Sequence, residues 1–379
     1  MCYKAVIANV RFLFYFMEMT QVDITTVSNR VVGRGSISNR GGRFEKLEIR
    51  FEDDGWARDL AQPMLRTQTS VESPRKVITY NKSPDLPFDR SINPYRGCEH
   101  GCVYCFARPT HEWLGLSAGL DFETRLIARP EAPQKLVQEL RHRAYTPQPI
   151  AIGTNTDPYQ PIEKKHEIMR ECLKVLRDCS HPVAVVTKGT LIERDIDILR
   201  DMARDGLVRV GISITSLDVT LSRKLEPRAP SPKRRLATIR ALSDAGIPVR
   251  IMTSPVIPGL TDHELESLLK AGSDAGAVAA SWIMLRLPLE VAPLFKEWLK
   301  EHYPDRAKRI MGHMRDMHGG QDYDSRWGQR MRGTGPYSEI IGQRFTGAVH
   351  RLGLNKKLPN LRTDLFRPPQ KAGDQMCLF

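Results

Sequence analysis

The sequence predicts an α/β protein whose central part is a partial (β/α)6 barrel, with extensions at both ends of the chain. Two patterns lead to this prediction. Short apolar runs rich in β-branched residues alternate with amphipathic stretches, and six such units follow one another. Such alternation is typical of a parallel sheet covered by helices. At 379 residues, the chain is long enough for one large domain or two ordinary ones.

This alternation predicts the position of each strand and helix. Strands are expected near residues 91–95, 149–153, 183–187, 208–214, 248–253 and 280–286. Helices are expected near residues 133–143, 165–178, 191–204, 232–245, 262–275 and 290–301. Two helix starts carry capping boxes, in which a hydroxyl and a glutamate satisfy free backbone amides: Thr190 with Glu193, and Thr261 with Glu264.

Four segments are expected along the chain. Residues 1–84 form a partly flexible N-terminal extension and residues 85–302 form the barrel. Residues 303–367 form a basic C-terminal region, and residues 368–379 form a flexible tail.

A loop after the first expected strand carries Cys98, Cys102 and Cys105 in a C-x3-C-x2-C spacing. Thiolates select zinc or iron–sulfur clusters. Complete structural sites of either kind normally use four protein ligands, so three clustered cysteines leave one metal position open. An open coordination position indicates a catalytic metal site rather than a structural one. The alternative is a zinc site completed by His100 or by another histidine, although the chain has no second cysteine pair.

The other cysteines are scattered, at Cys2, Cys172, Cys179 and Cys377. Cys172 and Cys179 fall on the apolar face of one expected helix, so we expect them to be buried core thiols. A metal-type cluster favours a reducing compartment over a disulfide framework. Because no apolar run has transmembrane length, we expect a cytoplasmic protein with no membrane partner.

The barrel arrangement predicts where functional side chains lie, because such barrels carry them at the carboxyl ends of their strands. The second strand ends in a polar cluster that contains Thr154 and Asn155. The third ends at Lys188, the fourth ends near Ser213, and the fifth leads into an apolar segment around Ile257. Taken singly, each strand tip is also explained by ordinary turn chemistry.

The cysteine spacing, with Tyr104 just before the last cysteine, resembles the signature loop of the radical S-adenosyl-L-methionine (SAM) superfamily. The resemblance implies that the three cysteines bind three irons of a 4Fe-4S cluster and that SAM chelates the fourth. It also implies a partial TIM-type barrel, an electron donor for the cluster, and reductive cleavage of SAM to methionine and a 5'-deoxyadenosyl radical.

The order of the strand tips is similar to that of the spore photoproduct lyase-like branch, which includes DNA repair photolyase-like proteins. On the basis of this resemblance, six residues are candidates for binding SAM: Tyr104, Thr154, Asn155, Lys188, Ser213 and Ile257. Lys188 is suited to the SAM carboxylate, and Ile257 belongs to the segment that flanks adenine in the family.

One position departs from that branch. Spore photoproduct lyases carry a cysteine at the end of the second strand, and this thiol returns a hydrogen atom to the product radical. Residues 152–155 contain no cysteine here. This leaves three alternatives: another residue such as a tyrosine returns the hydrogen atom, 5'-deoxyadenosine returns it, or the reaction is a different one. We therefore expect a related enzyme with a different or unknown substrate.

The formal net charge of +13 and the pI near 9.5 indicate a polyanionic partner, with DNA or RNA as the leading interpretation. A basic surface without a ligand is the alternative. Residues 322–337 interleave aromatic side chains with arginines, which suits single-stranded nucleic acid and a barrel lid equally well. Residues 34–42 are interpreted as a phosphate-contacting loop or as an arm wrapped on the barrel.

The end of the chain resembles the short peptide with which bacterial replication and repair proteins bind the β sliding clamp. Gln375, Leu378 and Phe379 match that pattern and follow a linker rich in proline and glycine. A frayed tail without a partner is the alternative.

The sequence thus favours a radical SAM enzyme that acts on nucleic acid, such as a DNA lesion or a modified base. A radical SAM enzyme acting on a protein or a small molecule is the first alternative. A non-enzymatic, metal-stabilised module that binds DNA or the clamp is the second.

Overall fold

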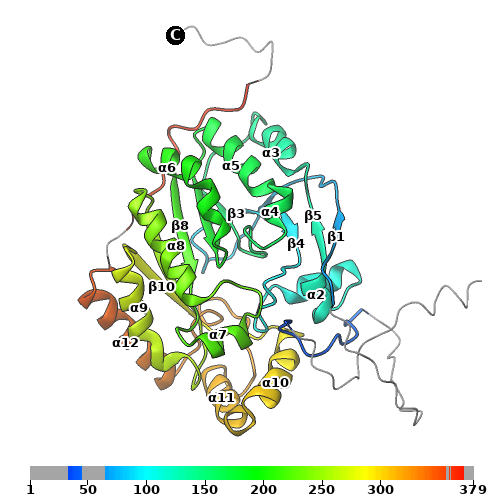
Figure 1. Ribbon diagram of the computed structural model, residues 1–379, viewed down its shortest axis with the longest axis vertical. Helices are drawn as coiled ribbons and strands as arrows, with labels where there is room; N and C mark the ends of the chain where they lie inside the picture. Colours follow the sequence, from blue (N-terminus) through cyan, green and yellow to red (C-terminus); the bar gives the residue numbers. More distant parts are fainter. Residues whose placement is uncertain (1–32, 45–64, 356–357, 359, 371–379) are drawn as a thin grey trace, which may run out of the picture.

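The computed structural model describes residues 33–44, 65–355, 358 and 360–370 (Figure 1). Within these residues, a seven-stranded sheet has the order β10-β9-β8-β7-β6-β3-β2. All neighbouring strands from β3 to β10 are parallel, and β2 pairs antiparallel to β3. The two edge strands, β10 and β2, do not pair with each other, so the barrel is open. The prediction of an α/β protein with a partial barrel is confirmed.

The barrel strands have the bounds β2 Ile78–Tyr80, β3 Arg90–Ile92, β6 Ile150–Ile152, β7 Val183–Thr187, β8 Val208–Ser213, β9 Val249–Val256 and β10 Ala279–Met284. A second sheet, of order β1-β5-β4, comprises β1 Gln68–Val71, β5 Arg125–Ala128 and β4 Tyr95–Arg96. The expected first strand, 91–95, is therefore divided between the two sheets. Neither β2 nor the second sheet was expected from the sequence.

The helices of the first part of the chain are η1 Arg108–Leu114, α2 Leu120–Thr124, α3 Ala132–Leu140, α4 Glu163–His166, α5 Ile168–Asp178, η2 Leu191–Asp195 and α6 Ile196–Arg204. Those of the second part are α7 Val219–Leu225, α8 Pro232–Asp244, η3 Asp262–Glu264, α9 Leu265–Asp274, α10 Val291–His302, α11 Pro304–Met317 and α12 Pro336–Arg351. Among the described residues, no helix combines the length and the apolar composition that a membrane span requires.

One expected helix, 165–178, is broken at Glu167. This residue adopts a left-handed conformation with φ of 51°, and it separates α4 from α5. The break has a local cause, because the carboxylate of Glu163 accepts hydrogen bonds of 3.2 and 3.1 Å from the backbone N–H of Met169 and so caps α5. Cys172 is buried on this helix and Cys179 is buried directly after it, as expected.

The two predicted capping boxes are wrong. Thr190 and Thr261 precede short 3-10 turns, η2 and η3, and neither side chain caps its turn. The Thr261 hydroxyl instead accepts a hydrogen bond of 2.8 Å from the backbone N–H of Ile257. Glu193 binds the guanidinium of Arg234. The Glu264 carboxylate accepts a hydrogen bond of 2.9 Å from the backbone N–H of Leu217, so both glutamates bind residues distant in the chain instead of closing a capping box.

The barrel interior follows the two-residue period of its strands. On β7 and β9, buried residues that face the surrounding helices alternate with half-buried residues that face the lumen. Val186 of β7 and Met252 and Ser254 of β9 belong to this second set, and all three line one cavity. The lumen is therefore a binding space at the carboxyl ends of the strands rather than a fully packed core.

The N-terminal residues 33–44 lie against the cysteine loop and helix α10. Ser38 donates a hydrogen bond of 2.7 Å to Glu297, and Arg40 forms an ion pair with the same carboxylate. Arg43 forms an ion pair of 3.2 Å with Glu290. Of the two interpretations of this segment, the structure supports an arm wrapped on the barrel.

Candidate active site

A buried ion pair fixes the loop that carries the three cysteines. Arg108, which is fully buried, donates hydrogen bonds of 3.0 Å to the Cys102 carbonyl and 3.2 Å to the Gly101 carbonyl. The same guanidinium lies 2.5 Å from the Glu123 carboxylate. Glu123 in turn accepts hydrogen bonds of 2.9 and 2.8 Å from the N–H groups of Gly35 and Ser36. The loop is thus held by charge and by the N-terminal arm together.

A cavity of about 200 Å³ lies at the carboxyl ends of the barrel strands. It is lined by residues of the cysteine loop and of the tips of β6 to β10: Cys98, His100, Cys102, Tyr104, Cys105, Phe106, Gly153, Thr154, Asn155, Thr156, Asp157, Val186, Thr187, Lys188, Ser213, Met252, Ser254, Pro255, Ile283, Met284 and Arg286. The three cysteines and most of the candidate SAM-binding residues therefore share one space.

Burial raises the pKa of all three cysteine thiols. Nearby cations oppose this effect, because Lys188 lowers the pKa of Cys102 and Arg108 and Lys188 lower that of Cys105. A bound metal would stabilise the thiolates outright. Three thiols on a cavity wall with cations beside them form a donor set suited to iron or zinc.

The described residues contain no group of three or more His, Cys, Asp or Glu side chains that could hold a single metal ion. All three thiols nevertheless line one cavity. The donor geometry thus gives no support to a single zinc ion, and three cysteine thiolates are the usual protein ligands of an iron–sulfur cluster with one open position.

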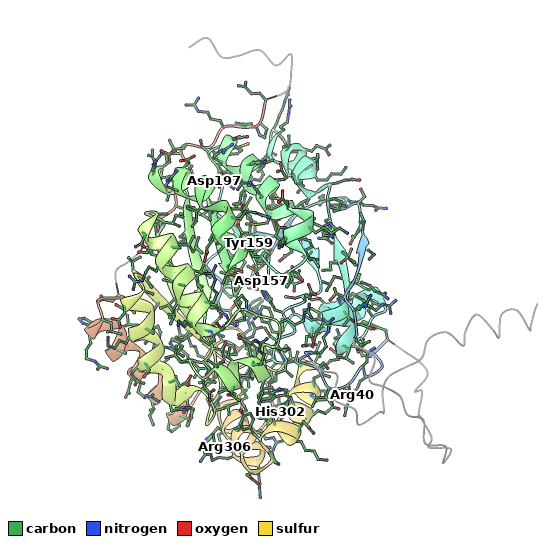
Figure 2. The ribbon with its side chains drawn as sticks, in the orientation of Figure 1. Arg40, Asp157, Tyr159, Asp197, His302 and Arg306 are labelled. Carbon is green, nitrogen blue, oxygen red and sulfur yellow. The ribbon has the colours of Figure 1, made fainter. Side chains whose placement is uncertain are left out.

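His100, the ligand of the zinc alternative, faces a carboxylate. Its Nδ1 lies 3.3 Å from Oδ2 of Asp157, and both residues line the cavity. Figure 2 shows Asp157 in the interior of the molecule, near Tyr159. Asp157 also accepts hydrogen bonds of 2.6 Å from the Thr187 hydroxyl and 2.7 Å from the Lys188 N–H. Burial raises the pKa of Asp157, but His100 and these bonds outweigh burial and lower the pKa to about 2.

Lys188, at the tip of β7, connects two neighbouring strand tips. Its ammonium donates a hydrogen bond of 2.7 Å to the Ser213 hydroxyl, which itself donates one of 2.9 Å to the Ser254 carbonyl. The ammonium also lies 3.3 Å from the buried carboxylate of Glu226. The cation is therefore held in the cavity wall by a carboxylate on one side and a hydroxyl on the other.

Glu226 is also the partner of Tyr104 and Arg235. The Tyr104 hydroxyl and the Arg235 guanidinium each donate to its carboxylate, and Thr215 donates a further bond of 2.8 Å. Burial raises the pKa of Glu226, but Arg235 and Lys188 outweigh burial and hold it below its usual range. Burial and the adjacent carboxylate raise the pKa of Tyr104 well above its usual range. Tyr104 is thus a neutral phenol whose hydroxyl is fully engaged.

The structure brings together most of the residues that sequence reasoning selected. Thr154 and Asn155 line the cavity after β6, and the Asn155 N–H donates a hydrogen bond of 3.1 Å to Asn93. Ile257 does not line the cavity, because it lies fully buried in the core beyond the end of β9. Ser254 and Pro255, earlier in the same segment, occupy the wall instead.

Sequence reasoning missed Glu226, Arg235 and Arg286. Glu226 and Arg235 lie outside the strand tips, between α7 and α8 and on α8, and no local pattern distinguishes them from surface charges. Arg286 directly follows the last barrel strand, so the rule that placed Lys188 would also have selected it.

A family model described as the radical SAM superfamily matches residues 92–271, the part of the chain that carries the cysteine loop and most of the barrel. The uncharacterized protein Rv2578c of Mycobacterium tuberculosis is 38% identical over 234 residues, which cover 60% of this chain and 69% of that protein. The chain belongs to the radical SAM superfamily. A second relative, the uncharacterized protein MJ0683 of Methanocaldococcus jannaschii, is 26% identical over 236 residues, which cover 62% of this chain and 84% of that protein.

Solved structures of another radical SAM enzyme share this fold. Spore photoproduct lyase complexed with dinucleoside spore photoproduct has a TM-score of 0.52 at 14% identity, covering 75% of this chain and 79% of that chain. A mutant of the same lyase with bound AdoMet and dinucleoside spore photoproduct has a TM-score of 0.53 at 14% identity, covering 80% and 85%. At this identity the likeness shows the fold alone.

Members of the radical SAM superfamily use a 4Fe-4S cluster together with SAM, and this chain is an enzyme of that type. The donor set fits both groups. Three thiols lie on one wall of the cavity, and a lysine, hydroxyls and an amide lie on the walls formed by the strand tips.

Proposed function

We propose that this radical SAM enzyme acts on nucleic acid, with a damaged or modified base as its substrate. The observation that carries the proposal is the composition of the cavity wall. The three cysteines, the Lys188–Ser213 pair and the cation Arg286, which has no carboxylate partner among the described residues, all line one space at the carboxyl ends of the strands. The net charge of +13 supports a polyanionic partner. The fold is also that of a lyase solved with a dinucleoside photoproduct.

In this proposal Cys98, Cys102 and Cys105 bind the 4Fe-4S cluster. Bound there, the reduced cluster would supply the one electron needed for cleavage of SAM to methionine and a 5'-deoxyadenosyl radical. Lys188 offers its ammonium to the SAM carboxylate, and Glu226 and Ser213 fix the direction of that ammonium. Thr154 and Asn155 offer polar groups at the tip of β6.

The wall of the cavity constrains how a hydrogen atom returns to the product. Within the described part of the chain, the thiols that line the cavity are those of the cysteine loop, because Cys172 and Cys179 lie on or directly after α5. The Tyr104 hydroxyl is engaged by Glu226 and Thr215. We therefore propose that 5'-deoxyadenosine, rather than a protein thiol, returns the hydrogen.

The proposal is tested by anaerobic reconstitution with iron and sulfide, reduction with dithionite, and quantification of 5'-deoxyadenosine with and without DNA. We expect a brown protein whose SAM cleavage increases when substrate-containing DNA is present. The variant in which Cys98, Cys102 and Cys105 are all replaced by alanine is the control and should form no 5'-deoxyadenosine. The nucleic-acid substrate would be contradicted if SAM cleavage by the wild type did not respond to undamaged, damaged or modified DNA or RNA. The same holds if SAM cleavage increased only with a protein or a small molecule.

We also propose that the chain binds the β sliding clamp through Gln375, Leu378 and Phe379, which lie outside the described residues. The described chain leads toward the amino ends of the barrel strands, where the Arg362 N–H donates a hydrogen bond of 3.1 Å to the Gly206 carbonyl. The last described residues therefore lie at the end of the barrel opposite the cavity. Removing residues 375–379 should abolish clamp binding in surface plasmon resonance and leave SAM cleavage unchanged. Unchanged clamp binding by the truncated protein would contradict the motif.

A further inference from the structure

One side of the cavity has no role in the functions assigned so far. The candidate SAM-binding residues Thr154, Lys188 and Ser213 follow or end β6, β7 and β8. In the sheet order, β10 lies beyond β9 on the far side of these three strands. Arg286 comes two residues after β10 and lines the same cavity. The side formed by β10 is therefore the one left for a substrate.

Arg286 is held in place by neutral groups. Its guanidinium donates hydrogen bonds of 3.3 and 3.1 Å to the Tyr323 hydroxyl and one of 3.6 Å to the sulfur of Met331. The guanidinium carbon also lies 4.7 Å from the centre of the Phe106 ring. A phenol and a thioether are weak acceptors for a cation, and the guanidinium has more N–H donors than these three bonds use.

The carboxylates of the neighbouring segments are paired with other cations. Asp324 accepts from Arg326 at 2.6 Å and Asp85 accepts from Arg330 at 2.6 Å. Asp322 is shared by Lys296 and Arg315. Among the described residues, no carboxylate lies within ion-pair distance of Arg286. Arg286 is thus a half-buried cation on a cavity wall without a counter-ion.

We propose that Arg286 binds a phosphodiester group of single-stranded nucleic acid, next to the nucleotide that enters the cavity. This inference rests on the proposed function. The two N–H bonds that Arg286 now donates to Tyr323 converge on one neutral oxygen, whereas a phosphate accepts two parallel N–H···O bonds on two charged oxygens. Phe106 is 44% exposed and lies against the same guanidinium, so it presents an aromatic surface on which a base can stack.

The shape of the site favours a single strand. Chemistry on a base inside a cavity requires that base to leave its stack, and the flanking phosphates then lie at the rim. Arg286 donates hydrogen bonds to Tyr323 and Met331. The backbone N–H of Met284, at the end of β10, donates a hydrogen bond of 2.9 Å to the Met331 carbonyl. Residues 323–331 therefore lie next to the substrate side of the cavity. Trp327 in this segment is 62% exposed.

The test measures binding of a short fluorescein-labelled oligothymidylate to the full-length, cluster-loaded protein with SAM, by fluorescence anisotropy over a series of KCl concentrations. Arg286→Met should weaken binding roughly tenfold at fixed salt. It should also reduce the slope of log Kd against log salt by about 0.7 to 1, because one phosphate contact is lost. Arg286→Lys keeps the charge and should retain the slope while losing part of the affinity.

The matched control is Arg362→Met, which removes the same charge from an exposed arginine paired with Asp364 at the other end of the barrel. It should leave affinity and slope unchanged. If the protein binds the oligonucleotide and Arg286→Met behaves like Arg362→Met, this inference alone fails. If the wild-type protein cleaves SAM but binds no oligonucleotide, the proposed nucleic-acid substrate and this inference fail together. Thermal unfolding verifies that each variant is folded. If Arg286→Met does not fold, the loss of affinity in Arg286→Lys serves as the test.

Discussion

The guanidinium of Arg330 forms a two-fold ion pair with the carboxylate of Asp85, with hydrogen bonds of 2.7 and 2.6 Å. Arg330 precedes Met331, whose carbonyl bonds to the end of β10, whereas Asp85 lies in the connection between β2 and β3. β10 and β2 are the two edge strands of the barrel sheet. A side-chain ion pair thus links the two sides of the open barrel, where no backbone ladder does so.

Replacing Asp85 with Asn should lower the free energy of unfolding by about 1–2 kcal/mol, because Arg330 loses a charged two-fold partner. Arg330 lowers the pKa of Asp85. The contribution of the pair is therefore present above the ordinary aspartate pKa of about 4 and is lost as pH falls below it. Urea denaturation at neutral and acidic pH measures both effects. Asp364→Asn, in an exposed pair with Arg362, should change stability little.

Replacing Lys188 with Met should weaken SAM binding by roughly 10- to 100-fold, because the SAM carboxylate loses its ammonium partner. Isothermal titration calorimetry on the cluster-loaded protein measures this affinity. Lys270→Met removes an equal charge from an exposed helix pair and should bind SAM like the wild type. Equal SAM affinity in both variants would show that Lys188 is not a SAM ligand.

Replacing Glu226 with Gln should lower the free energy of unfolding by about 3–5 kcal/mol, because it leaves the buried cation Arg235 without its counter-ion. Chemical denaturation with linear extrapolation measures this loss. Glu171→Gln, in an exposed pair with Lys174, should cost well under about 1 kcal/mol. Equal stability of the two variants would mean that the buried network is not needed to hold the cavity wall.

Replacing Gly153 with Ala should disturb the cavity more than the same change elsewhere. Gly153 has φ of 89°, and a Cβ there would lie 2.0 Å from the Val186 carbonyl oxygen, so β6 and β7 would have to separate. Gly320 has a similar φ of 86° but no atom within 4 Å of the added Cβ. Gly320→Ala should cost about 1 kcal/mol from backbone strain alone. Gly153→Ala should cost more in thermal unfolding and should also weaken SAM binding.

The two glycine variants separate strain from steric overlap. If both lose the same stability and both bind SAM normally, the close approach of β6 and β7 does not shape the site. A selective loss of SAM affinity in Gly153→Ala would place the tip of β6 beside the cofactor.

The cysteine loop, most of the barrel strands and the position of Lys188 at a strand tip could be predicted from local sequence patterns. These features depend on spacing and on a two-residue period, which are properties of neighbouring residues. The strand β7 lies at Val183–Thr187, as its apolar run predicts. Once a parallel barrel is inferred, the carboxyl ends of its strands indicate where cavity-lining side chains such as Lys188 lie.

The pairing of charged side chains, in contrast, depends on the three-dimensional fold. Glu226 meets Tyr104 and Arg235, and Arg330 meets Asp85, across long stretches of chain. No local pattern predicts these pairs, because strand register and helix packing determine which side chains meet. The same packing places Ile257 in the core and Arg286 in the cavity wall, where no described carboxylate pairs with it. The role of a charged side chain depends on the residues it contacts, and residues distant in the sequence come into contact only when the complete fold forms.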